Sequence, residues 1–269
     1  MLLCNEFQIY FADFLRDKEH AADNIVTLTA PVDDFGGRSL SDMHLRVTSM
    51  LKKYNIDYPS RQLNIVLFDD ALKHVLRIAR CLGMSRGSML LMGTEGTGKQ
   101  SLTRLASYCM GFSTIEVPTN KTYLVTDLLH DIKAISRMCG VQNKGITLLI
   151  TDKQINNKDF LEVIYSLLKT GTVPFLFTRE ELLSLSLSLS SVILPSDVKR
   201  SAVLKEENTD DNMVELFMNR VRNNLHIVFC LSPLPLELPD SVARYSGVLC
   251  FLYYYCSIFL QFPLIHMSR

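Results

Sequence analysis

Residues 88–106 have the sequence SMLLMGTEGTGKQSLTRLA, and this stretch decides the fold class. A short apolar strand leads into Gly93, and Gly93 together with Gly98 and Lys99 fits the pattern G-x-x-x-x-G-K. Glycines let the main chain turn tightly and direct its N–H groups toward phosphate oxygens. The helix expected to start near Lys99 directs the positive end of its dipole to the same place. The pattern therefore predicts a phosphate-binding loop (P-loop) between a strand and a helix.

The loop also defines the residues that we expect to bind a nucleotide, either ATP or ADP. They are Gly93, Thr94, Glu95, Gly96, Thr97, Gly98, Lys99, Gln100 and Ser101. In the usual pattern a Ser or Thr that coordinates magnesium follows the lysine directly, whereas this chain has Gln100. Ser101 lies one position later, about 100° further round a helix. Nucleotide binding is therefore expected, while magnesium coordination stays an open question.

A second signal is the apolar run at 146–150, which is followed by Thr151 and Asp152. An acid at the end of such a strand holds magnesium in P-loop enzymes, so Asp152 is the predicted metal residue. The alternative is that Asp152 is an ordinary turn residue. The next residue is Lys153, where an ATPase needs a carboxylate to deprotonate water, and a protonated lysine cannot accept that proton. Whether the chain is an enzyme is therefore left open, and we predict no catalytic residue.

Apolar strands alternate with helices along the middle of the chain. The expected strands lie at 88–92, 114–117, 146–150 and 227–231, and the expected helices at 71–82, 99–110, 124–138 and 160–168. Strands that are apolar nearly throughout indicate an α/β fold, with a parallel sheet covered by helices on both faces. The stretch 182–194, LLSLSLSLSSVIL, alternates Leu and Ser. This predicts a strand with one apolar face, or alternatively a low-complexity insertion.

Composition and charge restrict the function further. The 28 Lys and Arg residues balance the 28 Asp and Glu residues, so no net charge attracts nucleic acid or an anionic membrane. Seven cysteines without a C-x-x-C pair argue against a zinc site or a disulfide framework. The apolar run at 248–260 is shorter than the roughly 20 residues of a membrane span. We therefore expect a buried strand or an unpartnered tail there, no membrane span, and a cytoplasmic location.

Six stretches together resemble the fourth AAA+ module of the dynein heavy-chain motor ring. They are residues 64–72, 93–106, 151–155, 160–162, 171–177 and 217–233. The ending Lys99-Gln100-Ser101 is usual in that module, so Gln100 supports the resemblance. Because Lys153 stands where a glutamate is expected after Asp152, this strand ending resembles axonemal heavy chains more than cytoplasmic ones.

The resemblance implies three parts of the chain. A partly helical segment would occupy 1–62, the large subdomain of an AAA+ P-loop NTPase would occupy 63–233, and a divergent hydrophobic tail would occupy 234–269. In this interpretation the small helical lid of the family is missing and the chain is truncated. The resemblance also implies that Val66, Leu67 and Phe68 line an adenine pocket and that Ser232 occupies the sensor position.

In function, the resemblance implies a regulatory nucleotide-binding module of a ring of six AAA+ units, with weak or no hydrolysis. Its partners would be the other modules of the ring and other dynein complex subunits, and it would act on microtubules only indirectly. Its location would be the cytoskeleton and the axoneme of a cilium. Two alternatives remain, namely an active ATPase module completed by neighbouring subunits and a non-catalytic scaffold that keeps the fold.

Overall fold

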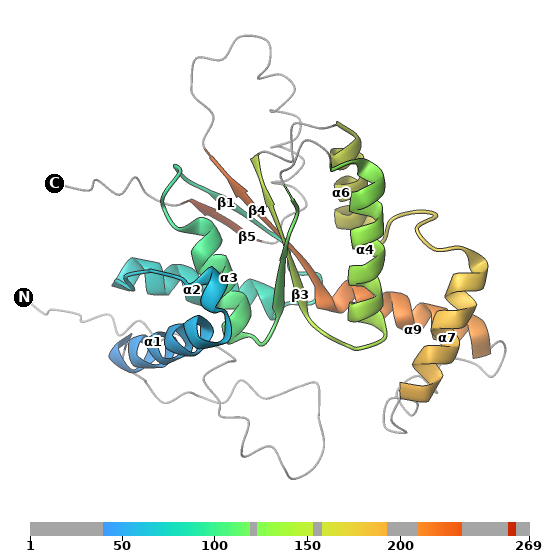
Figure 1. Ribbon diagram of the computed structural model, residues 1–269, viewed down its shortest axis with the longest axis horizontal. Helices are drawn as coiled ribbons and strands as arrows, with labels where there is room; N and C mark the ends of the chain where they lie inside the picture. Colours follow the sequence, from blue (N-terminus) through green and yellow to red (C-terminus); the bar gives the residue numbers. More distant parts are fainter. Residues whose placement is uncertain (1–39, 119–122, 153–157, 193–208, 233–257, 262–269) are drawn as a thin grey trace, which may run out of the picture.

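A computed structural model describes residues 40–118, 123–152, 158–192, 209–232 and 258–261 (Figure 1). The helices of these residues are α1 (Leu40–Asp57), the 3-10 helix η3 (Pro59–Arg61), α2 (Asp69–Leu82), α3 (Lys99–Cys109), α4 (Val125–Gly140), α6 (Lys158–Thr170), α7 (Arg179–Val192) and α9 (Thr209–Asn224). The strands are β1 (Met89–Met92), β2 (Ser113–Glu116), β3 (Ile146–Thr151), β4 (Leu225–Leu231) and β5 (Ile258–Gln261).

The five strands form one parallel sheet in the order β2-β3-β4-β1-β5. Strand β1, which leads into the P-loop, lies inside the sheet, with Met92 paired to Leu231 of β4 and to Gln261 of β5. Parallel neighbours cannot be joined by tight hairpins, and the chain passes through helices between β1 and β2, between β2 and β3 and between β3 and β4. All strands consequently end at the same edge of the sheet, which is where ligands bind in open α/β folds.

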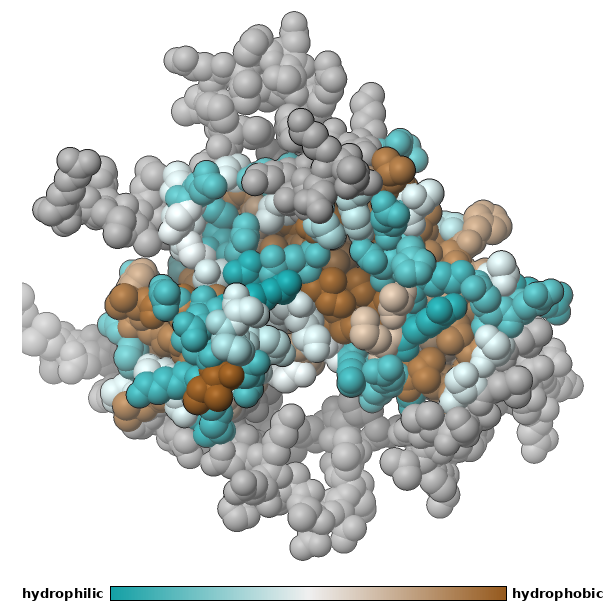
Figure 2. Space-filling model, in the orientation of Figure 1, coloured by the Kyte–Doolittle hydropathy of each residue, from teal (hydrophilic) through white to brown (hydrophobic). Residues whose placement is uncertain are grey.

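Helices cover both faces of the sheet, with α1, α2 and α3 on one side and α4, α6, α7 and α9 on the other (Figure 1). Successive residues of a strand point to opposite faces. Met89 and Leu91 accordingly pack with the first group of helices, whereas Leu90 packs with the second. This confirms the predicted parallel sheet covered on both faces, and it explains why β1, β3 and β4 are apolar over most of their length. In the view of Figure 2, hydrophobic surface is concentrated near the centre, between two largely hydrophilic regions.

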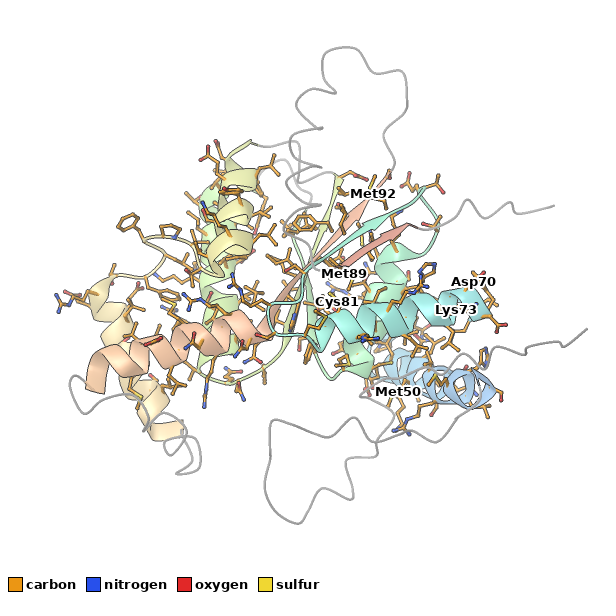
Figure 3. All side chains as sticks on the ribbon, turned by 180° about the vertical axis from the view of Figure 1, so that it is seen from behind. Met50, Asp70, Lys73, Cys81, Met89 and Met92 are labelled. Carbon is orange, nitrogen blue, oxygen red and sulfur yellow. The ribbon has the colours of Figure 1, made fainter. Side chains whose placement is uncertain are left out.

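The helices next to the P-loop agree with the predicted pattern. Helix α3 buries its predicted apolar positions, among them Leu102, Leu105 and Cys109. Helix α2 begins at Asp69, two residues before the expected start, and both Asp69 and Asp70 lie in its first turn. Acids in the first turn stabilise the positive end of the helix dipole. Figure 3 shows Asp70 and Lys73 together at this end of α2 and Cys81 close to Met89 at the start of β1.

The strand predicted for the Leu/Ser stretch was wrong, because residues 182–192 belong to helix α7. The helix starts with a capping box in which the N–H of Thr178 donates to Glu181 Oε2 (3.0 Å) and the N–H of Glu181 donates to Thr178 Oγ1 (3.3 Å). Leu185 and Leu189 lie one turn apart, and both are buried. An alternating sequence also places apolar residues four positions apart, so the tertiary contacts decided between the two structures.

The apolar run at 248–260 is described only at its end. There Ile258–Gln261 forms strand β5, which pairs in parallel with β1 and agrees with the expected strand. The remainder of the predicted tail lies outside the described residues, as does everything before Leu40. Within the part of the chain that the structure describes, no helix has the length and apolar character needed to cross a membrane.

Candidate nucleotide site

The loop between β1 and α3 has the backbone that the sequence motif requires. Gly96 and Gly98 have φ angles of 85° and 80°, in the left-handed region that residues with a side chain rarely adopt. A Cβ atom on Gly96 would meet no atom within 4 Å, so backbone conformation and not space requires glycine there. Gly98 is the N-cap of α3, so the loop ends at the positive end of the helix dipole.

Lys99 is folded back into this loop. Its Nζ donates to the carbonyl oxygens of Gly93 (2.5 Å) and Thr94 (2.7 Å) and to Thr97 Oγ1 (3.3 Å). These three bonds use all the donors of an ammonium group. Lys99 is 7% exposed, and burial lowers the pKa of its ammonium group. The three bonds hold the Lys99 ammonium group at the N-terminus of α3. Phosphate oxygens bound there would compete with the loop carbonyls for this group.

A cavity of about 560 Å³ opens beside the loop. Its lining comes from the P-loop, the start of α3 and the carboxyl ends of β2, β3 and β4. The lining residues are Glu95, Gly96, Gly98, Lys99, Gln100, Ser101, Glu116, Val117, Leu149, Thr151, Asp152, Cys230 and Ser232. Pockets that hold cofactors and other small ligands have volumes of about 300–1,000 Å³. The cavity is therefore large enough for a nucleotide.

The structure brings Asp152 and Ser232, the predicted metal and sensor residues, into contact. The backbone N–H of Ser232 donates to both carboxylate oxygens of Asp152, at 3.1 and 3.0 Å. This contact connects the end of β3 to the end of β4, and both residues line the cavity. Lys153, where the sequence lacks a carboxylate, lies outside the described residues.

Hydroxyl groups on α3 fix the helix behind the loop. Thr103 Oγ1 donates to the carbonyl of Lys99 (2.8 Å), and Ser107 Oγ donates to Thr147 Oγ1 of β3 (2.9 Å). Thr103, Ser107 and Thr147 are completely buried, so each hydroxyl needs a partner within the protein. The Ser107 bond fixes the C-terminal part of α3 to the start of β3, and the Thr103 bond lies within the first turns of the helix.

Sequence reasoning missed five residues of the cavity wall, namely Glu116, Val117, Leu149, Thr151 and Cys230. Glu116 ends β2, and its Oε1 accepts a bond from Arg104 Nε at 2.6 Å. An acid at the carboxyl end of a strand of this sheet was the signal that could have identified it. Burial raises the pKa of the Cys230 thiol to about 12, so the thiol stays protonated at neutral pH.

The predicted adenine residues do not line this cavity. Leu67 is buried in the hydrophobic core beside α2, whereas the side chains of Val66 and Phe68 are exposed (82% and 48%). The carbonyl of Leu67 accepts a bond from His44 Nε2 (2.7 Å), which attaches this segment to α1. An adenine-binding role for Val66 and Phe68 stays a prediction.

Comparison with known proteins adds to this geometry. The sequence family described as "P-loop containing dynein motor region D4" matches residues 63–259. The chain belongs to this family. The match runs from the segment before α2 into β5, so it includes β1 to β4 and the first half of β5. The AAA+ P-loop fold inferred from the sequence is therefore the fold of this chain.

Individual dynein heavy chains are similar over most of this chain. Dynein axonemal heavy chain 5 of Rattus norvegicus is 36% identical over 248 residues, which is 89% of this chain and 7% of that protein. Dynein axonemal heavy chain 8 of Homo sapiens is 31% identical, over 89% of this chain and 5% of that protein. The flagellar outer arm dynein gamma chain of Chlamydomonas reinhardtii is 32% identical, over 93% of this chain and 6% of that protein. The chain thus spans 5–7% of the length of these relatives.

Proposed function

We propose that the chain binds ATP or ADP as a regulatory module of an axonemal dynein motor, with weak or no hydrolysis. The observation that carries this proposal is the ammonium group of Lys99 held inside a glycine-rich loop at the N-terminus of α3. Main-chain N–H groups, the helix dipole and the lysine charge all act on an anion at that position. The adjoining cavity has room for the remainder of the nucleotide.

Weak hydrolysis is proposed because the residue directly after Asp152 is Lys153 and not a carboxylate. Of the three acids that line the cavity, Asp152 accepts the Ser232 N–H and Glu116 accepts a bond from Arg104. The third, Glu95, lies on the phosphate loop itself. An efficient ATPase needs a base within hydrogen-bond reach of the attacking water. Lys153 cannot be that base while it is protonated.

The residues of the site fit a magnesium ion. The Ser101 hydroxyl and the Asp152 carboxylate line the same cavity, and oxygen atoms are the ligands that Mg²⁺ prefers. A carboxylate has about four acceptor positions, so Asp152 can hold an ion while it accepts the Ser232 N–H. When bound, the ion would neutralise phosphate charge. Gln100, which is exposed, takes the usual place of the first hydroxyl ligand.

The partners and location follow from the proposed family role. We propose that the chain contacts other AAA+ modules of a dynein ring and other dynein complex subunits. The relatives named above include axonemal and flagellar chains, which supports the axoneme of a cilium as the location. Contact with microtubules would be indirect, through the rest of the motor.

Calorimetric titration with ATP and with ADP, in the presence of Mg²⁺, tests nucleotide binding. Lys99→Ala should weaken the affinity on the order of 100-fold, or about 2.7 kcal/mol, because it removes the charge from the loop. Lys144→Ala is a matched control, since Lys144 is exposed and does not line the cavity, and it should bind like the parent.

A folded parent chain that binds neither nucleotide would refute the proposal and favour the scaffold alternative. Equal affinity of the parent and the Lys99→Ala variant would place the nucleotide elsewhere. Phosphate release at several turnovers per second by the parent would favour the alternative of an active ATPase module.

A further inference from the structure

Glu116 lines the cavity and places a carboxylate there that nucleotide binding alone does not explain. It is the last residue of β2 and is paired in register with Leu149 of β3, three residues before Asp152. Glu116, Leu149 and Asp152 all line the same cavity as Lys99. A carboxylate therefore faces the proposed nucleotide space from the strand next to the one that lacks an acid at position 153.

An ion pair restrains this carboxylate. Arg104 Nε lies 2.6 Å from Glu116 Oε1, and the two side chains are 21% and 32% exposed. Such a charge-assisted bond is strong, and its partial burial limits screening by salt. The guanidinium stays charged at all physiological pH values, so the bond does not open by deprotonation of Arg104. While the bond persists, Oε1 is directed at Arg104 and the carboxylate is held in this position on the cavity wall.

We propose that Glu116 is the base available for ATP hydrolysis at this site and that Arg104 holds it inactive. This inference rests on the proposed nucleotide binding and explains why hydrolysis would be weak. Asp152 is less suited to the role, because both of its oxygens accept the Ser232 N–H and its place is that of the metal ligand. Glu95 lies on the loop that surrounds the phosphates, whereas Glu116 approaches from the opposite wall of strands.

The chemical step is a displacement by water at the terminal phosphorus. The water oxygen bonds to that phosphorus, and the bond from the phosphorus to the bridging oxygen breaks. ADP leaves with the electron pair of the broken bond, and Glu116 receives the proton from water. The products are ADP and inorganic phosphate, and the proton returns from the carboxylic acid to solvent.

Arg104 is placed to respond to the phosphate site. It lies in α3, five residues after Lys99, and α3 begins at the phosphate loop. The Thr103 hydroxyl bonds to the Lys99 carbonyl, so the first turns of the helix are connected directly to the lysine that would contact phosphate. A nucleotide bound at the loop would therefore contact the N-terminus of the same helix that carries Arg104. Release of Glu116 would then depend on nucleotide binding or on a neighbouring protein that takes over the guanidinium.

Steady-state phosphate release, together with nucleotide affinity from calorimetry, tests the inference in four variants. Arg104→Gln should raise the turnover of ATP on the order of tenfold and leave the affinity for nucleotide unchanged. This increase is a modest part of the rate enhancement that a general base contributes. Arg104→Lys should return turnover toward the parent value, because an ammonium also restrains the carboxylate. The double variant with Arg104→Gln and Glu116→Gln should not show this increase in turnover. Arg137→Gln is the matched control, since it removes a surface partner of Glu181 outside the cavity.

A pH profile separates this role from a structural one. Turnover of Arg104→Gln should fall in acid, and the double variant should not show this dependence. Unchanged turnover in an Arg104→Gln variant that binds nucleotide would overturn the inference, and so would a gain that survives Glu116→Gln. If Arg104→Gln is unstable, Arg104→Met keeps the packing of the aliphatic stem and serves the same test. Failure of every variant and of the parent to bind nucleotide would instead refute the proposed function.

Discussion

Helices α3 and α7 both bury leucines, yet they use their hydroxyl side chains in different ways. In α3, Ser107 is completely buried and bonds to Thr147 on β3. In α7, Ser184 and Ser188 are exposed and donate to the carbonyl oxygens of Glu181 and Ser184 within the same helix, each at 2.8 Å. Ser107 thus joins α3 to the sheet, whereas these bonds of Ser184 and Ser188 are made to backbone carbonyls of their own helix.

The difference shows how each helix is specified. A tight glycine turn and contacts to the sheet and to α2 position α3, so its place is part of the nucleotide site. A capping box and the packing of Leu185 and Leu189 in the second core position α7, which lies beside α9. Serines that bond back to their own helix are compatible with a helical backbone, although they do not favour it. Helix α7 therefore depends on its cap and on its neighbour.

Truncation of a core leucine in each helix should give the largest difference. Leu105→Ala in α3 should lower the free energy of unfolding by about 3–4 kcal/mol, because a fully buried leucine leaves a cavity between tightly packed layers. Leu189→Ala in α7 should cost about 2–3 kcal/mol, because the outer helix can relax toward α9. Denaturant unfolding measures both values.

Leu45→Ala in α1 is the control, since that side chain is 68% exposed, and it should change stability by less than about 0.5 kcal/mol. A larger loss of stability for Leu189→Ala than for Leu105→Ala would contradict the expectation that the core around α3 is packed more tightly than the core around α7.

Mild acid should act on the α3 side before it acts on the α7 side. His226 at the start of β4 is buried, its ring stacks on Phe112 after α3, and burial lowers its pKa from the ordinary value of 6.5. The unfolded chain therefore binds this proton more tightly than the folded chain. Stability from His226 is complete above pH 6.5 and decreases as the pH falls below that value.

On the α7 side, the bond from Lys133 and the N–H of Thr178 lower the pKa of Glu181 from 4.5. Its contribution is therefore complete above pH 4.5 and is lost only in stronger acid. Unfolding measured between pH 7.5 and about 5 should show a loss of stability that His226→Gln reduces and Glu181→Gln does not. An equal loss in the parent and in His226→Gln would show that other groups cause it.

Removal of the cap should give the smallest of these effects. Thr178→Ala should lower stability by about 1 kcal/mol, because the Glu181 N–H loses its acceptor. Hydrogen exchange should then become faster in the first turn of α7 and stay unchanged in α3. Thr126→Ala is a suitable control, because Thr126 is exposed in the first turn of α4 without being its cap. Uniformly faster exchange in both helices would mean that the cap acts on the whole domain.

Much of the fold and part of the site could be predicted from local sequence. The strand before Gly93, the helix after Gly98 and the apolar strand before Asp152 are short-range patterns, and the structure contains each of them. The Leu/Ser stretch was misassigned because an alternating pattern fits one face of a strand and also a helix with leucines four residues apart. The Thr178 to Glu181 capping box was visible in the sequence and would have favoured the helix.

The partners of the site residues could not be predicted, because they come from distant parts of the chain. Arg104 and Glu116 are separated by a helix end and a turn, and Asp152 and Ser232 by 80 positions. The parallel sheet order brings the ends of β2, β3 and β4 to one edge, which makes these residues neighbours. No period or local motif contains this information.

The amino-acid sequence by itself determined the phosphate loop, because glycine backbone freedom and one lysine act over only a few bonds. It also determined the alternation of buried strands and helices, because side-chain burial follows the period of each element. Only the tertiary structure decided that α7 is a helix, that Asp152 accepts the Ser232 N–H, and that Arg104 restrains Glu116. These features depend on which surfaces meet after the chain has crossed the sheet, and that competition among packing partners is settled only in the folded state.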